Sequence, residues 1–190
     1  LLKMNPVNET LGPVLARAFE PLRAAGYLEV IYGGGDVGAY AVKHALVGAC
    51  HITGSDRTYN AIVWGDNARG TTRTVDKPFS AELGCVTPVI VVPGPWSASD
   101  IEFQARHVAS MVTQNASFNC NAAKVIIVAR EWLQKDAFFE AVKQALSRTP
   151  PRRAYYPGAT ERWAAFKKRY PSAQVVGTET EGAVPWTVIP

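Results

Sequence analysis

Apolar residues recur at helical spacing in several stretches of the chain, and short continuous apolar runs lie between them. Spacings of three and four positions predict helices over residues 9–25, 36–46, 56–64, 99–117, 133–146 and 164–170. The short apolar runs predict strands over residues 27–32, 49–53, 79–83, 88–92 and 124–129. This alternation, with short connections, predicts an α/β fold with a parallel sheet and right-handed crossovers.

The pattern divides into two parts, with a boundary near residues 84–88. Residues 1–84 resemble part of a nucleotide-binding, Rossmann-like sheet, and residues 85–190 form a second α/β unit. Gly26 is expected to end the first helix. Ser99 and Glu102 have the spacing of a capping box at the start of the helix over 99–117. The polar segment 65–73 is expected to be an exposed loop.

Composition places the chain among packed domains: 47% of its 190 residues are hydrophobic and 19% are charged. These values exclude disordered, collagenous and coiled-coil classes. Apolar runs stay shorter than the roughly 20 residues that cross a bilayer, and no secretory signal opens the chain. A soluble, cytoplasmic protein is therefore expected, with no membrane partner. The ends, Leu1-Leu2 and Ile189-Pro190, suggest a piece of a longer chain.

The cysteines and the charge point to no metal site and to no nucleic acid. Cys50, Cys85 and Cys120 are widely spaced and form no Cys-x-x-Cys or zinc-ligand pattern. Net charge is +4, and seven basic residues lie in the stretch 148–170 against the single acid Glu161. Interleaved aromatic residues make this stretch similar to a phosphate or nucleic-acid patch. A solvated amphipathic helix is the favoured interpretation.

Two turns have the composition of phosphate-binding loops. The segment Gly33-Gly34-Gly35-Asp36-Val37-Gly38 fits G-x-G-x-x-G between a predicted strand and a predicted helix, so Gly33, Gly35 and Gly38 are candidate cofactor residues. A glycine turn needed only for tight packing is the alternative. Thr53-Gly54-Ser55, expected on an adjacent strand end, offers hydroxyl and N–H groups to a diphosphate. Asp56 is the acid nearest to the spacing of a ribose partner.

Two further residues are candidates for catalysis. Cys120 lies in a small, polar segment after a predicted helix, where a thiol can act as a nucleophile, although a lone cysteine is more often structural. Glu82 ends an apolar strand beside glycine and is a candidate general base, or else a surface acid. Cys50 lies in an apolar run and fits a structural role. The histidines have no spacing typical of a triad or a metal site.

In order, these motifs resemble the aldehyde dehydrogenase superfamily over most of the chain. His51-Ile52-Thr53-Gly54-Ser55 stands in place of Phe-Thr-Gly-Ser, and Glu82-Leu83-Gly84-Cys85-Val86-Thr87-Pro88 in place of Glu-Leu-Gly-Gly-Lys-Ser-Pro. Asn119-Cys120-Asn121-Ala122 stands in place of Gly-Gln-x-Cys-x-Ala. The resemblance implies that residues 1–84 belong to the dinucleotide-binding domain and residues 85–190 to the catalytic domain.

The resemblance also implies a reaction: oxidation of an aldehyde to a carboxylic acid with NAD or NADP. Cys120 is then the nucleophile that forms a thiohemiacetal and a thioester, and Glu82 activates the water that hydrolyses the thioester. Lys3 and Glu9 are expected at the adenosine ribose, where an acid favours NAD over NADP, and Leu83 is expected at the cofactor. An aldehyde substrate and a homo-oligomer are the implied partners.

Departures from the family pattern keep other functions open. Cys85 replaces the second glycine, Phe118 stands where glutamine is usual, and two of the family's motifs fall outside these residues. The isolated chain is therefore expected to show little or no turnover. One alternative is a CoA-dependent acylating enzyme that releases the same thioester to CoA, with the basic stretch at a CoA phosphate. A second is a non-catalytic fragment or dinucleotide-binding module with a silent thiol, and a nucleic-acid binder is the most distant.

Overall fold

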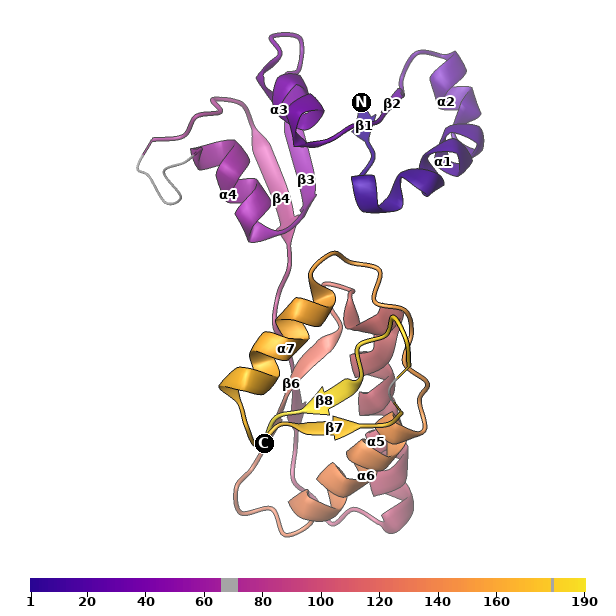
Figure 1. Ribbon diagram of the computed structural model, residues 1–190, viewed down its shortest axis with the longest axis vertical. Helices are drawn as coiled ribbons and strands as arrows, with labels where there is room; N and C mark the ends of the chain where they lie inside the picture. The colour runs from indigo at the N-terminus through magenta and orange to yellow at the C-terminus, as the bar shows by residue number, and fades with distance from the viewer. Residues whose placement is uncertain (66–71, 179) are drawn as a thin grey trace. The chain divides into compact units, whose positions relative to one another are not determined.

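The chain divides into two compact units, Leu1–Gly84 and Cys85–Pro190 (Figure 1). The structure is a computed structural model and describes residues 1–65, 72–178 and 180–190, so the predicted loop over 65–73 lies mostly outside the described residues. Both units are α/β, as predicted, and the described strands form four two-stranded sheets. Three of these pairs are parallel and one is antiparallel.

The first unit begins with a parallel pair of two-residue strands, β1 (Leu2–Lys3) and β2 (Val30–Ile31). The connection between them consists of three short helical segments: η1 (Pro6–Leu11), α1 (Gly12–Ala18) and α2 (Glu20–Ala24). The predicted strand over 27–32 is therefore shortened to two residues, and the single helix predicted over 9–25 is wrong. β1 has no counterpart among the predicted elements.

Two prolines account for the broken helix. Pro13 and Pro21 lie in the first turns of α1 and α2. Proline lacks an N–H group and its ring collides with the preceding turn, so each proline begins a helix and cannot continue one. The apolar spacing runs through both breaks, which is why it predicts one helix. Gly26, with a φ angle of 76°, follows α2 where the sequence placed the helix end.

The rest of the first unit contains a second parallel pair. Its elements are α3 (Gly35–Lys43), β3 (Cys50–Gly54), α4 (Asp56–Trp64) and β4 (Phe79–Leu83). Strand β3 pairs with β4, with Thr53 beside Glu82. Strand β2, which precedes the glycine turn, pairs only with β1 in the described residues. The expectation that the two candidate phosphate turns follow adjacent strands is therefore wrong.

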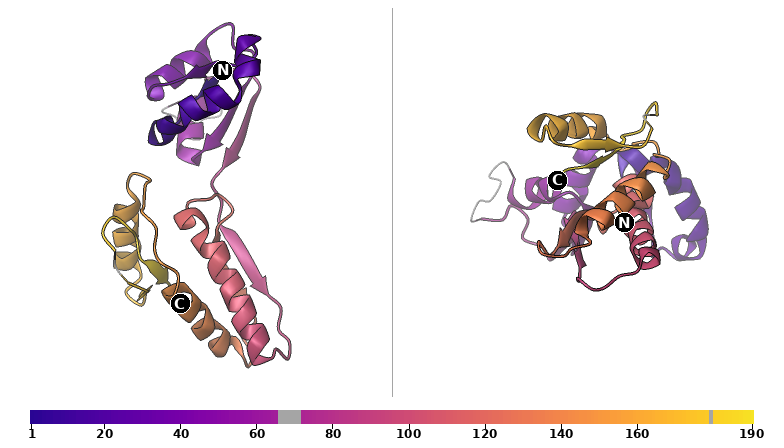
Figure 2. Two further views of the ribbon diagram at one scale, coloured as in Figure 1. Left: turned by 90° about the vertical axis from the view of Figure 1, so that its right-hand side faces the viewer. Right: turned by 90° about the horizontal axis from the view of Figure 1, so that it is seen from below.

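The second unit is built on the parallel pair β5 (Thr87–Val91) and β6 (Ala123–Val128), with Thr87 beside Ala123. The connection is α5 (Ala98–Thr113), and α6 (Lys135–Ser147) follows β6. These two helices lie side by side in two perpendicular views (Figures 1 and 2). Because the strands are parallel, the segments that enter β5 and β6 reach the same edge of the pair.

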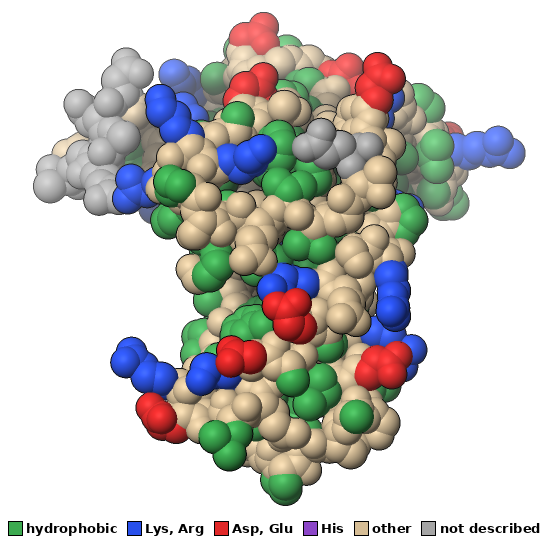
Figure 3. Space-filling model, turned by 60° about the horizontal axis from the view of Figure 1, so that its bottom comes forward, with side chains coloured by type: hydrophobic (Ala, Val, Ile, Leu, Met, Phe, Trp, Pro, Cys, Tyr) green, Lys and Arg blue, Asp and Glu red, His purple; other side chains and the backbone are tan. Residues whose placement is uncertain are grey.

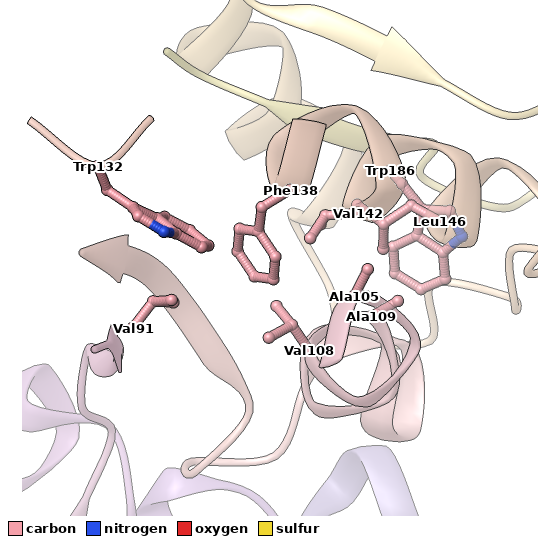
Figure 4. Packing of buried hydrophobic residues seen from close by; sticks show 9 residues of the cluster. All are labelled: Val91, Ala105, Val108, Ala109, Trp132, Phe138, Val142, Leu146 and Trp186. Carbon is pink, nitrogen blue, oxygen red and sulfur yellow. The ribbon is translucent and has the colours of Figure 1, made fainter. Parts of the chain in front are cut away.

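Aromatic and aliphatic side chains from both helices, β5 and the C-terminal hairpin form one core (Figure 4). Phe138 on α6 is fully buried, with its ring centre 5.8 Å from those of both Trp96 and Trp132. The indole N–H of Trp132 donates to Gly94 O at 3.2 Å, and that of Trp186 donates to Thr149 O at 2.8 Å. Both buried indoles therefore have the polar partner that burial requires.

The C-terminal part of the second unit consists of α7 (Ala159–Arg169) and an antiparallel hairpin of β7 (Gln174–Val176) and β8 (Trp186–Val188). Helix α7 begins five residues earlier than predicted, and the hairpin was not predicted. The Trp163 indole of α7 donates to Thr187 Oγ1 at 2.8 Å. This bond attaches the basic helix to β8.

Several basic residues around α7 have structural partners. Lys167 lies 4.3 Å from the centre of the Trp163 ring, and Arg162 donates to Pro157 O at 3.1 Å. The contacts of Lys167 and Arg162 favour the amphipathic-helix interpretation of the basic stretch. Figure 3 draws one face of the whole molecule, on which Lys and Arg side chains are interspersed with Asp and Glu.

The capping box of α5 lies two residues before the predicted one. Ser97 Oγ accepts the N–H of Asp100 at 3.2 Å, and Asp100 Oδ2 accepts the N–H of Ser97 at 2.9 Å. Hydrogen bonds from the hydroxyl and then the backbone N–H of Ser97 lower the pKa of Asp100. Gln134 fixes the chain just before the cap, because its side-chain amide bonds both the N–H and the carbonyl of Trp96. This tertiary contact therefore acts together with the local Ser-x-x-Asp spacing of Ser97 and Asp100 at the start of α5.

The turn η2 (Gln114–Ser117) follows α5 and has an unusual backbone. Asn115, Ala116 and Ser117 have φ angles of 49°, 54° and 65°, which is left-handed conformation at three successive non-glycine residues. Such residues are strained because the Cβ approaches the following carbonyl oxygen. The predicted helix over 99–117 therefore ends at Thr113, and a strained turn leads into the Cys120 segment.

Replacing Ser97 by alanine is expected to lower the free energy of unfolding of the second unit by about 1 kcal/mol at pH 7, because one N-terminal N–H of α5 loses its acceptor. Urea unfolding followed by tryptophan fluorescence measures the change. The difference from wild type should shrink as the pH falls below 3.8, the ordinary carboxyl pKa, because the cap uses ionised Asp100.

Ser99→Ala is the matched control, because Ser99 bonds only the Ser97 hydroxyl among the side-chain contacts described. It should change stability by a few tenths of a kcal/mol at most. A larger loss for Ser99→Ala than for Ser97→Ala would contradict this assignment of the cap.

Replacing Ala116 by glycine is expected to stabilise the second unit by about 0.5–1 kcal/mol, because glycine relieves left-handed strain that exceeds its own entropic cost. The same substitution at the exposed helical residue Ala137 of α6 should destabilise by about 1 kcal/mol. Both are measured as shifts in urea unfolding. Destabilisation by both variants would show that Ala116 is not strained.

Candidate active site

Cys120 is exposed and lies in the loop between η2 and β6. The N–H of Ala122 donates to Asn119 O at 3.1 Å and closes a turn around the cysteine. Ala122 and Ala123, which follow, are buried. The loop therefore presents the thiol at the surface while its C-terminal end is buried at the start of β6.

Side chains from three places hold the strained turn that precedes Cys120. Asn115 Nδ2 donates to Asn119 Oδ1 at 3.1 Å and to the Tyr155 hydroxyl at 2.8 Å. The Phe118 ring lies 5.0 Å, centre to centre, from those of both Tyr155 and Tyr156. A residue at left-handed φ persists only where its surroundings determine it, and this network supplies that support.

Lys124, the second residue of β6, fixes the other side of the turn. Its ammonium donates to Ser117 O at 2.7 Å and to Ser117 Oγ at 2.8 Å. Partial burial lowers the pKa of Lys124, and the nearby Cys85 thiol group acts in the opposite direction. The loop of Cys120 thus has a cation at its base.

Cys85 enters the same group from the segment before β5. Its thiol donates to the carbonyl of Cys120, with Sγ and O 2.7 Å apart, and lies 3.3 Å from Thr87 Oγ1. Cys85 is exposed. The residue that replaces a family glycine therefore contacts the backbone of the candidate nucleophile directly.

In the first unit, the candidate residues Glu82 and Leu83 end β4, and Thr53 and Gly54 end β3. The register places Thr53 beside Glu82 and Gly54 beside Leu83. All four thus lie at the carboxyl ends of two paired parallel strands, the edge where open α/β sheets bind ligands. Glu82 is exposed there.

Ser55 and Thr53 already make hydrogen bonds. Ser55 Oγ accepts the N–H of Thr58 at 3.1 Å and so caps α4. Thr53 Oγ1 lies 3.3 Å from His51 Nε2, whose Nδ1 lies 2.8 Å from Ser80 Oγ. The first turn of α4 therefore has one of its N–H groups satisfied by the chain itself.

The glycine turn leads from β2 into α3, whose N-cap Gly34 makes no side-chain capping bond. Gly33 has a φ angle of 122°, and a Cβ there would lie 2.6 Å from Val37 Cγ2. A Cβ at Gly35 would meet nothing within 4 Å. The turn thus requires glycine at Gly33 for its own packing, while at Gly35 the chain leaves open space.

Lys3 supports this turn. Its ammonium donates to Gly33 O at 2.6 Å and to Met4 O at 3.1 Å, and a Cβ at Gly38 would lie 3.3 Å from Lys3 Cε. Glu9 is half-buried in η1, where its carbonyl accepts the N–H of Gly12. Contacts of Lys3 and Glu9 with an adenosine ribose stay predictions.

The structure thus forms three groups from the predicted residues. Lys3, Gly33 and Gly38 meet at the first turn; Thr53, Gly54, Glu82 and Leu83 meet at the ends of β3 and β4; Cys120 lies in the second unit. The sequence analysis missed Lys124, Asn115 and Tyr155 as supports of the Cys120 loop. A lysine four residues after Cys120, at the start of an apolar strand, was the available signal.

The described residues contain neither a metal-binding cluster nor a membrane-spanning helix. Residues 1–65, 72–178 and 180–190 contain no group of three or more His, Cys, Asp and Glu side chains placed to hold a metal ion. Within the same ranges, no helix is both long and apolar enough to cross a bilayer.

Comparison with known proteins identifies the family. Residues 1–158 match the family model of the aldehyde dehydrogenase family. N-succinylglutamate 5-semialdehyde dehydrogenase 1 of Caulobacter vibrioides is 28% identical over 130 residues, which cover 66% of this chain and 25% of that protein.

Two solved structures show the same fold. A mutant of proline utilization A from Bradyrhizobium japonicum has a TM-score of 0.70 and 22% identity over 91% of this chain and 19% of its own. An NAD-dependent benzaldehyde dehydrogenase from Corynebacterium glutamicum has a TM-score of 0.69 and 21% identity, over 92% of this chain and 38% of its own. The chain therefore spans between about a fifth and two fifths of these relatives. With its family match over residues 1–158, the chain belongs to the aldehyde dehydrogenase family.

Proposed function

We propose that the chain is part of an NAD(P)-dependent aldehyde dehydrogenase that oxidises an aldehyde to a carboxylic acid through Cys120. The observation that carries the proposal is the placement of this cysteine in a chain of this family. It is exposed on a loop that a strained, hydrogen-bonded turn and the cation of Lys124 hold in place. A catalytic thiol needs both access and fixed orientation.

The proposed reaction uses this chain's residues in two steps. The sulfur of Cys120 attacks the aldehyde carbon and forms a thiohemiacetal, which becomes a thioester when its carbon loses a hydride and its hydroxyl group loses a proton to solvent. Glu82 then accepts a proton from water, the water oxygen attacks the thioester carbon, and the carbon–sulfur bond breaks. The carboxylic acid leaves and Cys120 returns to its thiol form. NAD or NADP, when bound, supplies the nicotinamide that accepts the hydride.

The first unit has features that fit a dinucleotide. Gly35 leaves open space at the start of α3, and no side chain caps this helix, so its N–H groups can approach a phosphate. Lys3 also stabilises the glycine turn, because its ammonium donates a hydrogen bond to Gly33 O. We assign Gly33, Gly35 and Gly38 to the pyrophosphate, with Thr53, Gly54, Ser55 and Leu83 at the neighbouring strand ends.

The proposal stops at the class of substrate. The names of the relatives specify a succinylated semialdehyde in one case and benzaldehyde in another. We therefore propose an aldehyde without naming one. A homo-oligomer, a cytoplasmic location and a preference for NAD over NADP remain predictions of the same proposal.

Replacing Gly35 by alanine is expected to weaken NAD binding by at least about tenfold without lowering the melting temperature, because the new methyl group enters open space at the start of α3, where the pyrophosphate is proposed to bind. Isothermal titration calorimetry with NAD and thermal unfolding measure the two quantities.

Gly48→Ala is the matched control, because a Cβ there also meets nothing within 4 Å and Gly48 lies outside the glycine turn. It should bind NAD as wild type does. Wild-type NAD affinity in the Gly35→Ala variant, or no NAD binding by the unsubstituted chain at millimolar concentration, would count against this cofactor site.

Iodoacetamide is expected to alkylate Cys120 at least about tenfold faster than the half-buried Cys50, because Cys120 is exposed to the reagent. NAD should change the rate at Cys120 and leave the rate at Cys50 unaltered. Peptide mass mapping over time measures both rates.

Equal, NAD-insensitive labelling of Cys120 and Cys50 would instead support a binding module with a silent thiol.

A separate experiment, product analysis with and without CoA, distinguishes hydrolysis of the thioester from acyl transfer to CoA. Formation of an acyl-CoA would replace Glu82-dependent hydrolysis as the second step.

A further inference from the structure

Cys85 and Cys120 meet at one edge of the β5–β6 pair. Cys85 lies two residues before β5 and Cys120 lies three residues before β6, and the parallel register brings both segments to the same end. Cys85 Sγ is 2.7 Å from Cys120 O. Standard bond lengths then place Cys85 Sγ no more than about 5.5 Å from Cys120 Cα.

Contact of the Cys85 sulfur with the backbone of Cys120 places the two residues side by side. A disulfide joins cysteines whose Cα atoms usually lie about 4.4–6.8 Å apart, so the bond requires the Cys120 side chain to rotate and its exposed loop to adjust until the two sulfurs meet. Both cysteines are exposed, so a small oxidant can reach them. Cys50 is half-buried on β3 of the other unit.

Lys124 supplies the charge that thiol chemistry uses. Its ammonium is held at Ser117 by two hydrogen bonds and interacts with Cys85. Disulfide formation proceeds through attack by a thiolate, the anionic group that an ammonium attracts. The three groups, two thiols and one ammonium, come from separate segments that the fold brings together.

We propose that Cys85 is a resolving thiol that converts oxidised Cys120 into a reversible Cys85–Cys120 disulfide. The oxidant is a hydroperoxide. The Cys120 thiolate attacks the peroxide oxygen, the O–O bond breaks, and the products are a sulfenic acid on Cys120 and an alcohol, or water from hydrogen peroxide. The Cys85 thiolate then attacks the Cys120 sulfur, the S–O bond breaks, and hydroxide leaves as water after protonation. Two electrons pass from the two thiols to the peroxide.

The disulfide goes beyond the proposed function, and its detection does not depend on it. If Cys120 is the nucleophile of an aldehyde dehydrogenase, the bond switches the enzyme off until a thiol reductant restores both cysteines. The bond itself is measured by mass, without turnover or cofactor. Failure of the disulfide therefore leaves the dehydrogenase proposal standing, and the reverse also holds.

The test treats the 190-residue chain with hydrogen peroxide, blocks remaining thiols with N-ethylmaleimide, and maps linked peptides after trypsin. Cleavage after Lys and Arg, except before Pro, places the cysteines in three different peptides: residues 44–57, 74–106 and 107–124. Peptides 74–106 and 107–124 are expected to be linked at least about tenfold more than either other pair, and dithiothreitol should release them. Monomer isolated from a non-reducing gel restricts the measurement to intramolecular bonds.

Four variants locate the chemistry. Cys85→Ser should leave Cys120 without a resolving thiol, so that dithiothreitol recovers at least about tenfold less Cys120 thiol and sulfinic acid accumulates. Cys50→Ser, the matched control, should keep the Cys85–Cys120 bond. Lys124→Gln should slow formation of the bond, and Lys124→Arg should restore it in part.

Three results would overturn the proposal: no linked 74–106 and 107–124 peptides in wild type, equal linkage of all three pairs, or full recovery of Cys120 in Cys85→Ser. Circular dichroism checks that each variant is folded. The wild-type mapping decides the question even if Cys85→Ser does not fold.

Discussion

The parallel pairing of β5 with β6 is the constraint on which the second unit depends. With Thr87 beside Ala123, the chain must enter both strands at one edge. The 16 residues of α5 form the crossover that this topology requires. Burial of Phe138, Val91 and Trp132 in one core holds the pair against the helices. An antiparallel pair would send the two entering segments to opposite ends, and Cys85 could not contact the Cys120 loop.

The strained turn before Cys120 persists because contacts from other segments of the second unit fix its backbone. Three left-handed residues cost about 1–2 kcal/mol each, which a small domain tolerates only where other contacts determine the backbone. Asn115, Tyr155 and Lys124 supply those contacts from three segments of the chain. The turn also ends α5 sharply, so that Cys120 leaves the helix axis and reaches the surface while Ala122 and Ala123 are buried. The strained turn therefore lets the chain place an exposed thiol only a few residues before the buried first residue of β6.

Local pattern predicted most elements because helix and strand periods are properties of short segments. The strand over 79–83 and the helix over 56–64 coincide with β4 and α4. The failures are at positions that long-range contacts decide. Gln134 bonds Trp96, the residue before the Ser97 cap, from 38 positions away in the sequence. Strands β1 and β7 are too short to show a period without their partners. Pro13 and Pro21 are the exception, since proline chemistry is local and was outweighed by the apolar spacing.

The residues of the candidate site also fall into two classes, those indicated by local sequence and those that only long-range contacts reveal. Cys120, Glu82 and the glycine turn are visible as residue types at motif positions, and the family match over residues 1–158 supports the interpretation of these motifs. Lys124 and Tyr155 act on the Cys120 loop only through folded contacts. A lysine soon after Cys120 is visible in the sequence, but its hydrogen bonds to Ser117 are not. Cys85 lies between these cases: its departure from the family's glycine is visible in sequence, but its contact with Cys120 O is not.

Cysteine at residue 85, in place of the family's glycine, changes the chemistry available where the chain enters β5 and β6. A glycine at residue 85 would leave the carbonyl of Cys120 without the thiol donor that the structure shows. With cysteine there, the backbone of the loop gains a hydrogen bond and the candidate nucleophile gains a neighbouring sulfur. An exposed thiol is open to oxidation beyond the sulfenic state, which is not reversible by simple thiols. In the proposed disulfide, a second thiol captures the sulfenic acid at the reversible step, so exposure need not lead to permanent loss of the candidate nucleophile.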